Sequence, residues 1–149
     1  MNPTRQHFSI LPMQEDDILP LFEMGLAQWG HDEWLTQRYL STSFAQPGWS
    51  FTAKCGGKII GGIIAVEVDI VPQWIRYLIV DHQWRRSGIA SALLKHVMEQ
   101  LSPGSSVHVD TGVKDAPALA FYHAQGFIKQ GRIRSFYGEE DAYVFCKPI

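Results

Sequence analysis

The chain has 149 residues, of which 46% are hydrophobic and 19% are charged, so it has the size of one domain and enough apolar material for a buried core. This composition excludes a disordered chain. The formal net charge of -2 argues against a general nucleic-acid binder, because such proteins usually carry a basic excess.

The cysteines and the apolar runs limit the class of protein further. Cys55 and Cys146 have no second Cys or His at zinc spacing, so we expect no metal site. We expect two reduced, partly buried thiols, and a single disulfide is the alternative. No stretch is long and apolar enough for a signal peptide or a membrane span. The sequence therefore predicts a soluble, cytoplasmic protein that binds neither membrane nor nucleic acid.

The first half of the chain predicts a strand, two helices, a hairpin and a buried strand. These elements are expected over residues 7–12, 14–30, 31–40, 49–68 and 74–80. Asp16 or Asp17 can cap the first helix, and Asp32 the second. The pair Gly56-Gly57 between two β-rich runs is typical of a tight hairpin turn. The continuous apolar run of the last strand indicates a central position, buried on both faces.

The second half predicts a helix, a strand, a second helix and two closing strands. These elements are expected over residues 87–101, 106–113, 115–127, 127–136 and 142–149. Asp115 is the expected cap of the second of these helices, and Gly126 its end. The full order, β-α-α-β-β-β-α-β-α-β-β, has no repeat or linker, so we expect one α/β (α+β) domain over residues 1–149.

The junction after the buried strand reads DHQWRRSGIASALL over residues 81–94. The first N–H groups of a helix lack internal partners, and Ser87, Gly88 and Ala90 are small enough to let an anion approach them. Arg85 and Arg86 add positive charge beside these groups. An ordinary strand-to-helix turn with a solvated arginine pair is the alternative. Neither a P-loop nor a Gly-x-Gly-x-x-Gly dinucleotide motif is present.

Two motifs in this half resemble those of one family. The pattern Arg85-x-x-Gly88-x-Ala90 resembles the Gln/Arg-x-x-Gly-x-Gly/Ala signature of the GNAT superfamily of acyl-CoA-dependent N-acetyltransferases. About thirty residues later, the chain is similar to the family's second motif, Asn-x-x-Ala-x-x-Leu/Phe-Tyr-x-x-x-Gly-Phe. The matching positions are Asp115, Ala118, Phe121, Tyr122, Gly126 and Phe127. Asp115 departs from the usual Asn: it caps a helix equally well but, when ionised, donates no hydrogen bond.

The resemblance implies a fold and a cofactor site. The fold is a single GNAT-like domain with a mixed, mostly antiparallel sheet of six to seven strands, about four helices and a V-shaped splay between strands 4 and 5. N–H groups in the junction would hold the pyrophosphate of acetyl-CoA, the acyl donor. The preceding strand edge would pair with the pantetheine arm, and an N–H near Ile79 or Val80 would polarise the thioester. The implied set is Leu78, Ile79, Val80, Arg85, Arg86, Ser87, Gly88, Ile89, Ala90, Ser91, Asp115, Ala118 and Tyr122.

The implied reaction is direct attack of an amine on the thioester, which needs an acid and a base. Tyr122 fills the family's acid position; a tyrosine that only packs in the core is the alternative. The buried strand holds no carboxylate, although many family members have a Glu there. Asp110 is therefore the first candidate base, with a bridging water, and Glu67 and Asp69 come next. His108 shares a strand face with Asp110 by period-two spacing.

The acceptor site is expected from the first two helices and the last hairpin. Trp29, Trp34 and Tyr137 are the implied acceptor-binding residues, and core packing is the alternative for each. Further aromatic candidates are His31, Tyr39, Phe44, Trp49 and Phe136.

The predicted function is transfer of an acetyl group from acetyl-CoA to a primary amine, on a small molecule or on a protein N-terminus. A non-catalytic acyl-CoA-binding protein is the alternative, because the strand carboxylate is missing. We expect a monomer or a homodimer.

Overall fold

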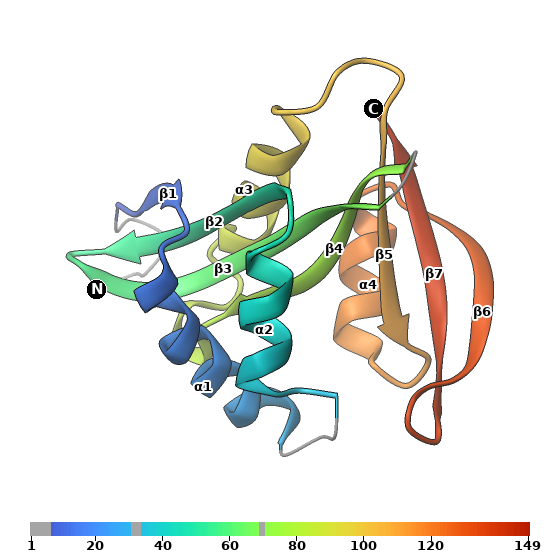
Figure 1. The fold of residues 1–149 in the computed structure, drawn as a ribbon, viewed down its shortest axis with the longest axis horizontal. Coiled ribbons are helices and arrows are strands. Elements are labelled where there is room, and N and C mark those ends of the chain that lie inside the picture. The colour runs from blue at the N-terminus through green and yellow to red at the C-terminus, as the bar shows by residue number, and fades with distance from the viewer. Residues whose placement is uncertain (1–6, 31–33, 69–70) are drawn as a thin grey trace.

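The computed structural model describes residues 7–30, 34–68 and 71–149 (Figure 1). Its helices are α1 (Ile18–Trp29), α2 (Gln37–Phe44), α3 (Ile89–Met98) and α4 (Ala116–Ala124), with short 3-10 turns η2 (Glu15–Asp17) and η3 (His82–Trp84). Its strands are β1 (Ser9–Pro12), β2 (Gly48–Cys55), β3 (Lys58–Val68), β4 (Val71–Val80), β5 (Ser106–Gly112), β6 (Ile128–Tyr137) and β7 (Glu140–Pro148). The element order predicted from the sequence is confirmed.

The strands form one seven-stranded sheet in the order β1-β2-β3-β4-β5-β7-β6. All neighbours are antiparallel except β4 and β5, which are parallel. This parallel pair is short, because only residues 73–75 pair with residues 107–109. Beyond these pairs the two strands diverge, so the predicted splay between strands 4 and 5 is confirmed.

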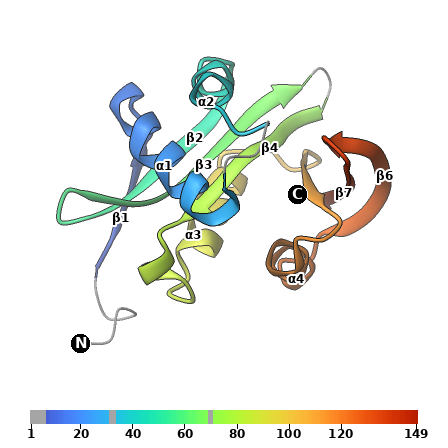
Figure 2. The same cartoon turned by 90° about the horizontal axis from the view of Figure 1, so that it is seen from below.

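The helices cover both faces of the sheet. Figure 2 shows α1 and α2 on one face and α3 and α4 on the other. The core under α3 and α4 includes Leu93, Leu94 and Phe127, and the core under α1 and α2 includes Leu21 and Leu40. Full burial of one such side chain contributes about 1.5–3 kcal/mol. Two cores on one sheet therefore hold β4 and β5 in place at the splay.

The second helix starts later than the sequence predicted. It begins at Gln37, where the Thr36 hydroxyl oxygen accepts from the backbone N–H of Tyr39 at 2.9 Å. A threonine in this position satisfies one of the free N–H groups of a helix start. The predicted start at residue 31 is therefore wrong, and the predicted cap, Asp32, lies outside the described residues.

Asp17 precedes α1 but does not cap it. Its buried carboxylate accepts hydrogen bonds from the Gln14 N–H and the Thr52 hydroxyl, both at 2.9 Å, and lies 3.3 Å from Lys54 Nζ. Asp17 therefore ties the start of α1 to β2, and the predicted cap is wrong.

The strands β2, β3 and β4 follow the prediction with one exception. Gly56 and Gly57 have φ values of 57° and 82°, as the predicted tight turn requires. In β4, Ile75, Tyr77 and Ile79 are buried, but the residues between them are only half-buried. The expectation of burial on both faces is wrong for that reason: one side of β4 faces the splay.

Gly25 sets how closely α1 approaches the sheet. The Tyr77 hydroxyl donates to the Leu21 carbonyl at 2.6 Å, directly beneath this glycine. A Cβ at position 25 would overlap the Tyr77 hydroxyl and lie 3.0 Å from Leu35 Cδ2. We expect Gly25→Ala to lower the free energy of unfolding by about 1–3 kcal/mol, because the buried contact is overpacked.

Urea denaturation of the Gly25→Ala variant measures this change. Gly131→Ala is the matched control, since a Cβ there meets no atom within 4 Å. In a helix without a steric constraint, replacing glycine by alanine raises the stability. An unchanged or increased free energy of unfolding in Gly25→Ala would therefore contradict the tight contact.

Candidate active site

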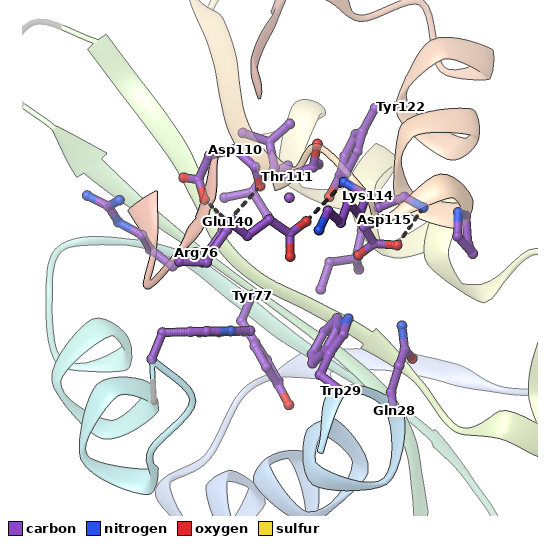
Figure 3. A pocket seen from close by; sticks show the side chains of 18 of the residues that line it. Gln28, Trp29, Arg76, Tyr77, Asp110, Thr111, Lys114, Asp115, Tyr122 and Glu140 are labelled. Atoms are coloured by element: carbon purple, nitrogen blue, oxygen red, sulfur yellow. Dashed lines mark hydrogen bonds between the residues drawn. The ribbon is translucent and has the colours of Figure 1, made fainter. Parts of the chain in front are cut away.

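A cavity of about 430 Å³ opens where β4 and β5 diverge (Figure 3). α1, α2, β4, β5, α4 and the β6–β7 hairpin all contribute to its lining. Several residues predicted from the sequence line it together: Trp29, Trp34, Leu78, Asp110, Asp115, Ala118, Tyr122 and Tyr137. The fold therefore gathers the predicted acid, the first candidate base and the predicted acceptor residues in one space.

The loop before α3 presents free N–H groups. Gly88 is the N-cap of α3 with a φ of 83°, and Arg86 also has a positive φ of 61°. Among the described residues, no backbone carbonyl accepts from the N–H groups of residues 86–91, and the first helical bond runs from Ala92 to Gly88. A Cβ at Gly88 would meet no atom within 4 Å. These unpaired N–H groups around open space fit a phosphate.

The side chains of this loop have other partners. The Ser87 hydroxyl donates to the Trp84 carbonyl, and the Ser91 hydroxyl accepts from Gln125 Nε2 at 2.9 Å. Arg85 donates to Gln28 Oε1 on α1 at 2.7 Å. An anion bound here would therefore rest mainly on backbone N–H groups rather than on serine hydroxyls.

The edge of β4 at the splay also has unpaired backbone groups. Asp81 N–H donates to the Ile60 carbonyl at 2.8 Å, and bonds to a neighbouring antiparallel strand alternate along a strand. Ile79 therefore directs its backbone groups to β3. Leu78 and Val80 direct theirs into the splay, where β5 no longer pairs with β4. Of the three predicted edge residues, these two can bond an extended ligand.

Asp110 is held by two donors. Trp74 Nε1 donates to Oδ2 at 2.7 Å, and the Tyr137 hydroxyl donates to Oδ1. Burial and the charge of Asp110 raise the pKa of Tyr137, so it remains a protonated donor. A carboxylate has about four lone-pair sites, so Asp110 can still accept from an ammonium group.

His108 does not act directly on Asp110. Its ring stacks on Trp74 at a centroid distance of 5.5 Å, so the indole contacts both residues. Its Nδ1 atom is buried and has no hydrogen-bond partner among the described residues. Burial lowers the pKa of His108, which favours the neutral ring.

Tyr122 is buried, and its ring packs against Phe121 and Phe127 at 5.0 and 5.2 Å. Burial raises its pKa, and the charges of Asp110 and Asp115 raise it further, so the phenol is protonated at neutral pH. Beside it in the cavity, Thr111 has a buried hydroxyl with no partner among the described residues. Such a group is costly in an empty site and indicates a polar ligand.

Asp115 caps α4 as predicted, accepting from the Ala118 N–H at 3.2 Å. The departure from the family's Asn therefore leaves the helix start intact.

Trp29, Trp34 and Tyr39 form an aromatic wall in the lining of the cavity. Trp34 lies 5.6 Å from Trp29, 5.8 Å from Tyr39 and 5.6 Å from Tyr137, measured between ring centroids. Burial, followed by the charge of Asp110, raises the pKa of Tyr39 to about 12. The wall therefore offers apolar ring faces, and its one hydroxyl, on Tyr39, stays protonated and donates to the Arg76 carbonyl at 3.2 Å.

Some predicted residues lie elsewhere. Glu67 is exposed at the end of β3 and does not line the cavity, so it has no position from which to act as a base there. His31 and Asp69 lie outside the described residues. The cavity lining also lacks three of the aromatic candidates: Phe44, Trp49 and Phe136.

Three further charged residues line the cavity: Arg76 and Lys114, which no sequence pattern singles out, and Glu140, which belongs to an acidic turn of residues 139–141 that can attract a positively charged acceptor. Glu140 accepts from the backbone N–H of Lys114 at 2.9 Å, which joins the β6–β7 hairpin to the end of β5. Its place in an acidic turn was visible, but its approach to β5 depends on strand pairing. Among the described residues, no helix is long and apolar enough to cross a membrane.

The family model and the relatives that match this chain are all named as acetyltransferases. The family model for the acetyltransferase (GNAT) domain matches residues 47–129. An N-alpha-acetyltransferase of Sulfurisphaera tokodaii is 32% identical over 114 residues, which cover 66% of this chain and 68% of that protein. The ribosomal protein bS18-alanine N-acetyltransferase of Escherichia coli is 30% identical over 119 residues, covering 76% and 74%. The crystal structure of Ard1 from Thermoplasma volcanium shares the fold, with a TM-score of 0.81, 21% identity and coverage of 95% and 97%.

Proposed function

The chain belongs to the GNAT family of acetyltransferases, and from that membership we propose that it transfers an acetyl group from acetyl-CoA to the α-amine at the N-terminus of a polypeptide. The observation that carries the proposal is the cavity in which Leu78 of the β4 edge, Tyr122 and Asp110 meet. One relative is named an N-alpha-acetyltransferase and another acts on an alanine of ribosomal protein bS18, which favours a peptide α-amine over a small amine as the acceptor. The transferase activity in both names also favours catalysis over acyl-CoA binding alone.

The donor would be held by backbone groups on either side of η3. N–H groups of residues 86–91 would bind the pyrophosphate, and Leu78 and Val80 would bond the pantetheine arm. The unpaired Thr111 hydroxyl supports a polar ligand group beside β5. Acetyl-CoA supplies the activated acetyl group, and the N–H groups of Leu78 or Val80 would stabilise negative charge on the thioester oxygen.

Two protons leave an acceptor that arrives as an ammonium ion, and one proton reaches the sulfur. Once the first proton is removed, the neutral amine nitrogen bonds to the carbonyl carbon, the C–S bond breaks, and the thiolate takes the Tyr122 proton; the second nitrogen proton then passes through water to the Tyr122 phenolate. Asp110, fixed by Trp74 and Tyr137, attracts the ammonium and takes its proton directly or through a water. Tyr122 therefore acts on the leaving group, and Asp110 acts on the nucleophile.

The weakness of a carboxylate base favours an α-amine as acceptor. An α-amine has a pKa of about 7.7–8.0, whereas a lysine side chain has a pKa of about 10.4. At pH 7 roughly a tenth of α-amines are neutral, but fewer than about one lysine in a thousand is. A peptide N-terminus therefore needs less help from Asp110 to lose its proton than a lysine side chain does.

Free-thiol release tests the proposal. The protein is mixed with acetyl-CoA and with three matched acceptors: a peptide with a free N-terminus, the same peptide blocked at its N-terminus but carrying a lysine, and a small alkyl amine. We expect acceptor-dependent release with the free peptide above all, and one added acetyl group at its α-amine by mass spectrometry. Equal or greater release with the small amine would overturn the proposed acceptor.

Asp110→Asn tests the base. We expect kcat/KM to fall by about tenfold to a hundredfold near pH 7, because the amide neither attracts an ammonium nor takes its proton. The loss should shrink above the pKa of the α-amine, where the acceptor is already neutral. A loss of the same size at pH 7 and pH 9 would show that Asp110 only holds Tyr137 and Trp74 in place.

A further inference from the structure

Arg76 lies at the point where the sheet opens. Its neighbour Ile75 is the last β4 residue paired with β5, opposite Val109, so Arg76 and Asp110 are the first residues of the two strands beyond that pairing. Both line the cavity, on either side of the splay (Figure 3). Arg76 and Asp110 therefore lie on opposite strands of the splay, each one residue beyond the last pair.

A bulge in β4 fixes this position. β3 residues Ile64 and Ala65 pair with Tyr77 and Ile75, so Arg76 is the extra residue between them. A bulge changes the direction of a side chain relative to regular alternation. The Arg76 carbonyl, which the ladder does not use, accepts from the Tyr39 hydroxyl at 3.2 Å. The backbone of Arg76 is therefore anchored to α2 as well as to the sheet.

The guanidinium group is oriented but not neutralised. Its central carbon lies 5.5 Å from the centroid of the Trp74 ring, a cation–π distance. Within the described part of the chain, ion pairs join Lys54 to Asp17 and Arg132 to Asp141, and Arg76 has none. Asp110, on the strand across the splay, accepts from the neutral donors Trp74 and Tyr137 instead.

We propose that Arg76 determines acceptor specificity by binding a carboxylate within the first two residues of the peptide. This inference rests on the proposed function, and it narrows the acceptor class to peptides that begin with an acidic side chain close to the α-amine. A planar guanidinium group matches a carboxylate in charge and in bidentate geometry. Asp110 and Arg76 together would bind the two opposite charges of such an N-terminus.

Matched peptides test this inference. Peptides beginning Ala-Glu and Glu-Ala are compared with their Ala-Gln, Gln-Ala, Ala-Lys and Lys-Ala counterparts by kcat/KM in free-thiol release. For the wild-type protein, we expect at least one Glu peptide to exceed its Gln counterpart by about tenfold or more. We also expect this ratio to fall in high salt, because part of the attraction is screened.

Charge reversal separates recognition from damage to the fold. Arg76→Gln should bring the Glu-to-Gln ratio close to one, and Arg76→Glu should make the Lys peptide the better acceptor. A misfolded variant loses all acceptors together and does not exchange one preference for another. Arg134→Gln is the control, because Arg134 is exposed on β6 and does not line the cavity; it should keep the wild-type ratio.

Two further outcomes are distinguishable. If the wild-type protein acetylates Glu, Gln and Lys peptides equally, or if Arg76→Glu keeps the wild-type preference, the role of Arg76 is wrong while N-terminal acetylation stands. If no peptide accepts an acetyl group but small amines do, the proposed function and this inference are both overturned.

Discussion

Replacing Tyr122 with Phe is expected to lower kcat by about a hundredfold or more, with the Kd for acetyl-CoA changed by less than about twofold. The substitution removes the phenol proton that the leaving thiolate would take. It keeps the ring, which packs between Phe121, Phe127 and the more distant Phe145. Because the contacts of the ring remain, the loss should appear in turnover rather than in binding.

Steady-state kinetics and calorimetric titration of acetyl-CoA measure the two quantities separately. Tyr143→Phe is the matched control. Tyr143 lies on β7, outside the cavity lining, and the centroid of its ring lies 4.0 Å from Lys129 Nζ. The control should keep wild-type kcat. If Tyr122→Phe also keeps it, the proton comes from elsewhere and Tyr122 is a core residue alone.

Replacing Gly88 with Val is expected to weaken acetyl-CoA binding by about tenfold or more. A φ of 83° is open to glycine but costs other residues about 1–2 kcal/mol or more, and a β-branched side chain suits it least. The loop would leave the conformation that exposes its N–H groups, or the new methyl groups would fill the open space beside them. Either result removes the phosphate site.

Gly104→Val isolates the effect of backbone strain. Gly104 has a φ of 91°, has no atom within 4 Å of an added Cβ, and follows the other end of α3. We expect both variants to lose stability by similar amounts, and only Gly88→Val to lose affinity for acetyl-CoA. Normal affinity in Gly88→Val would eliminate the loop as the pyrophosphate site.

The sequence predicted those parts of the site that depend on local pattern. Gly88 and Asp115 mark helix starts that their neighbours identify, and Tyr122 follows from its place in a motif. The sequence pattern predicts a continuous buried strand through Trp74 and Arg76, because the bulge arises from the register with β3 and leaves no local signal. The Asp110–Tyr137 bond joins residues 27 positions apart through two strand pairings.

The start of α2 shows the same limit on a smaller scale. Both Asp32 and Thr36 are good caps by residue type, and the packing of Trp34 against Trp29 and Tyr137 accompanies a start at Gln37. Capping propensity ranks Asp and Thr almost equally, and tertiary contacts decide which residue begins the helix.

The free edge of β4 makes the fold incomplete at one place. No strand in the described part of the chain pairs with the outward backbone groups of Leu78 and Val80, so a ligand that bonds them takes the place of a neighbouring strand. Such a ligand binds the native state and not the unfolded chain, so mass action raises the free energy of unfolding, by about 2.7 kcal/mol at a hundred times its Kd. The melting temperature therefore reports occupancy of the cavity, even in a variant that no longer turns over.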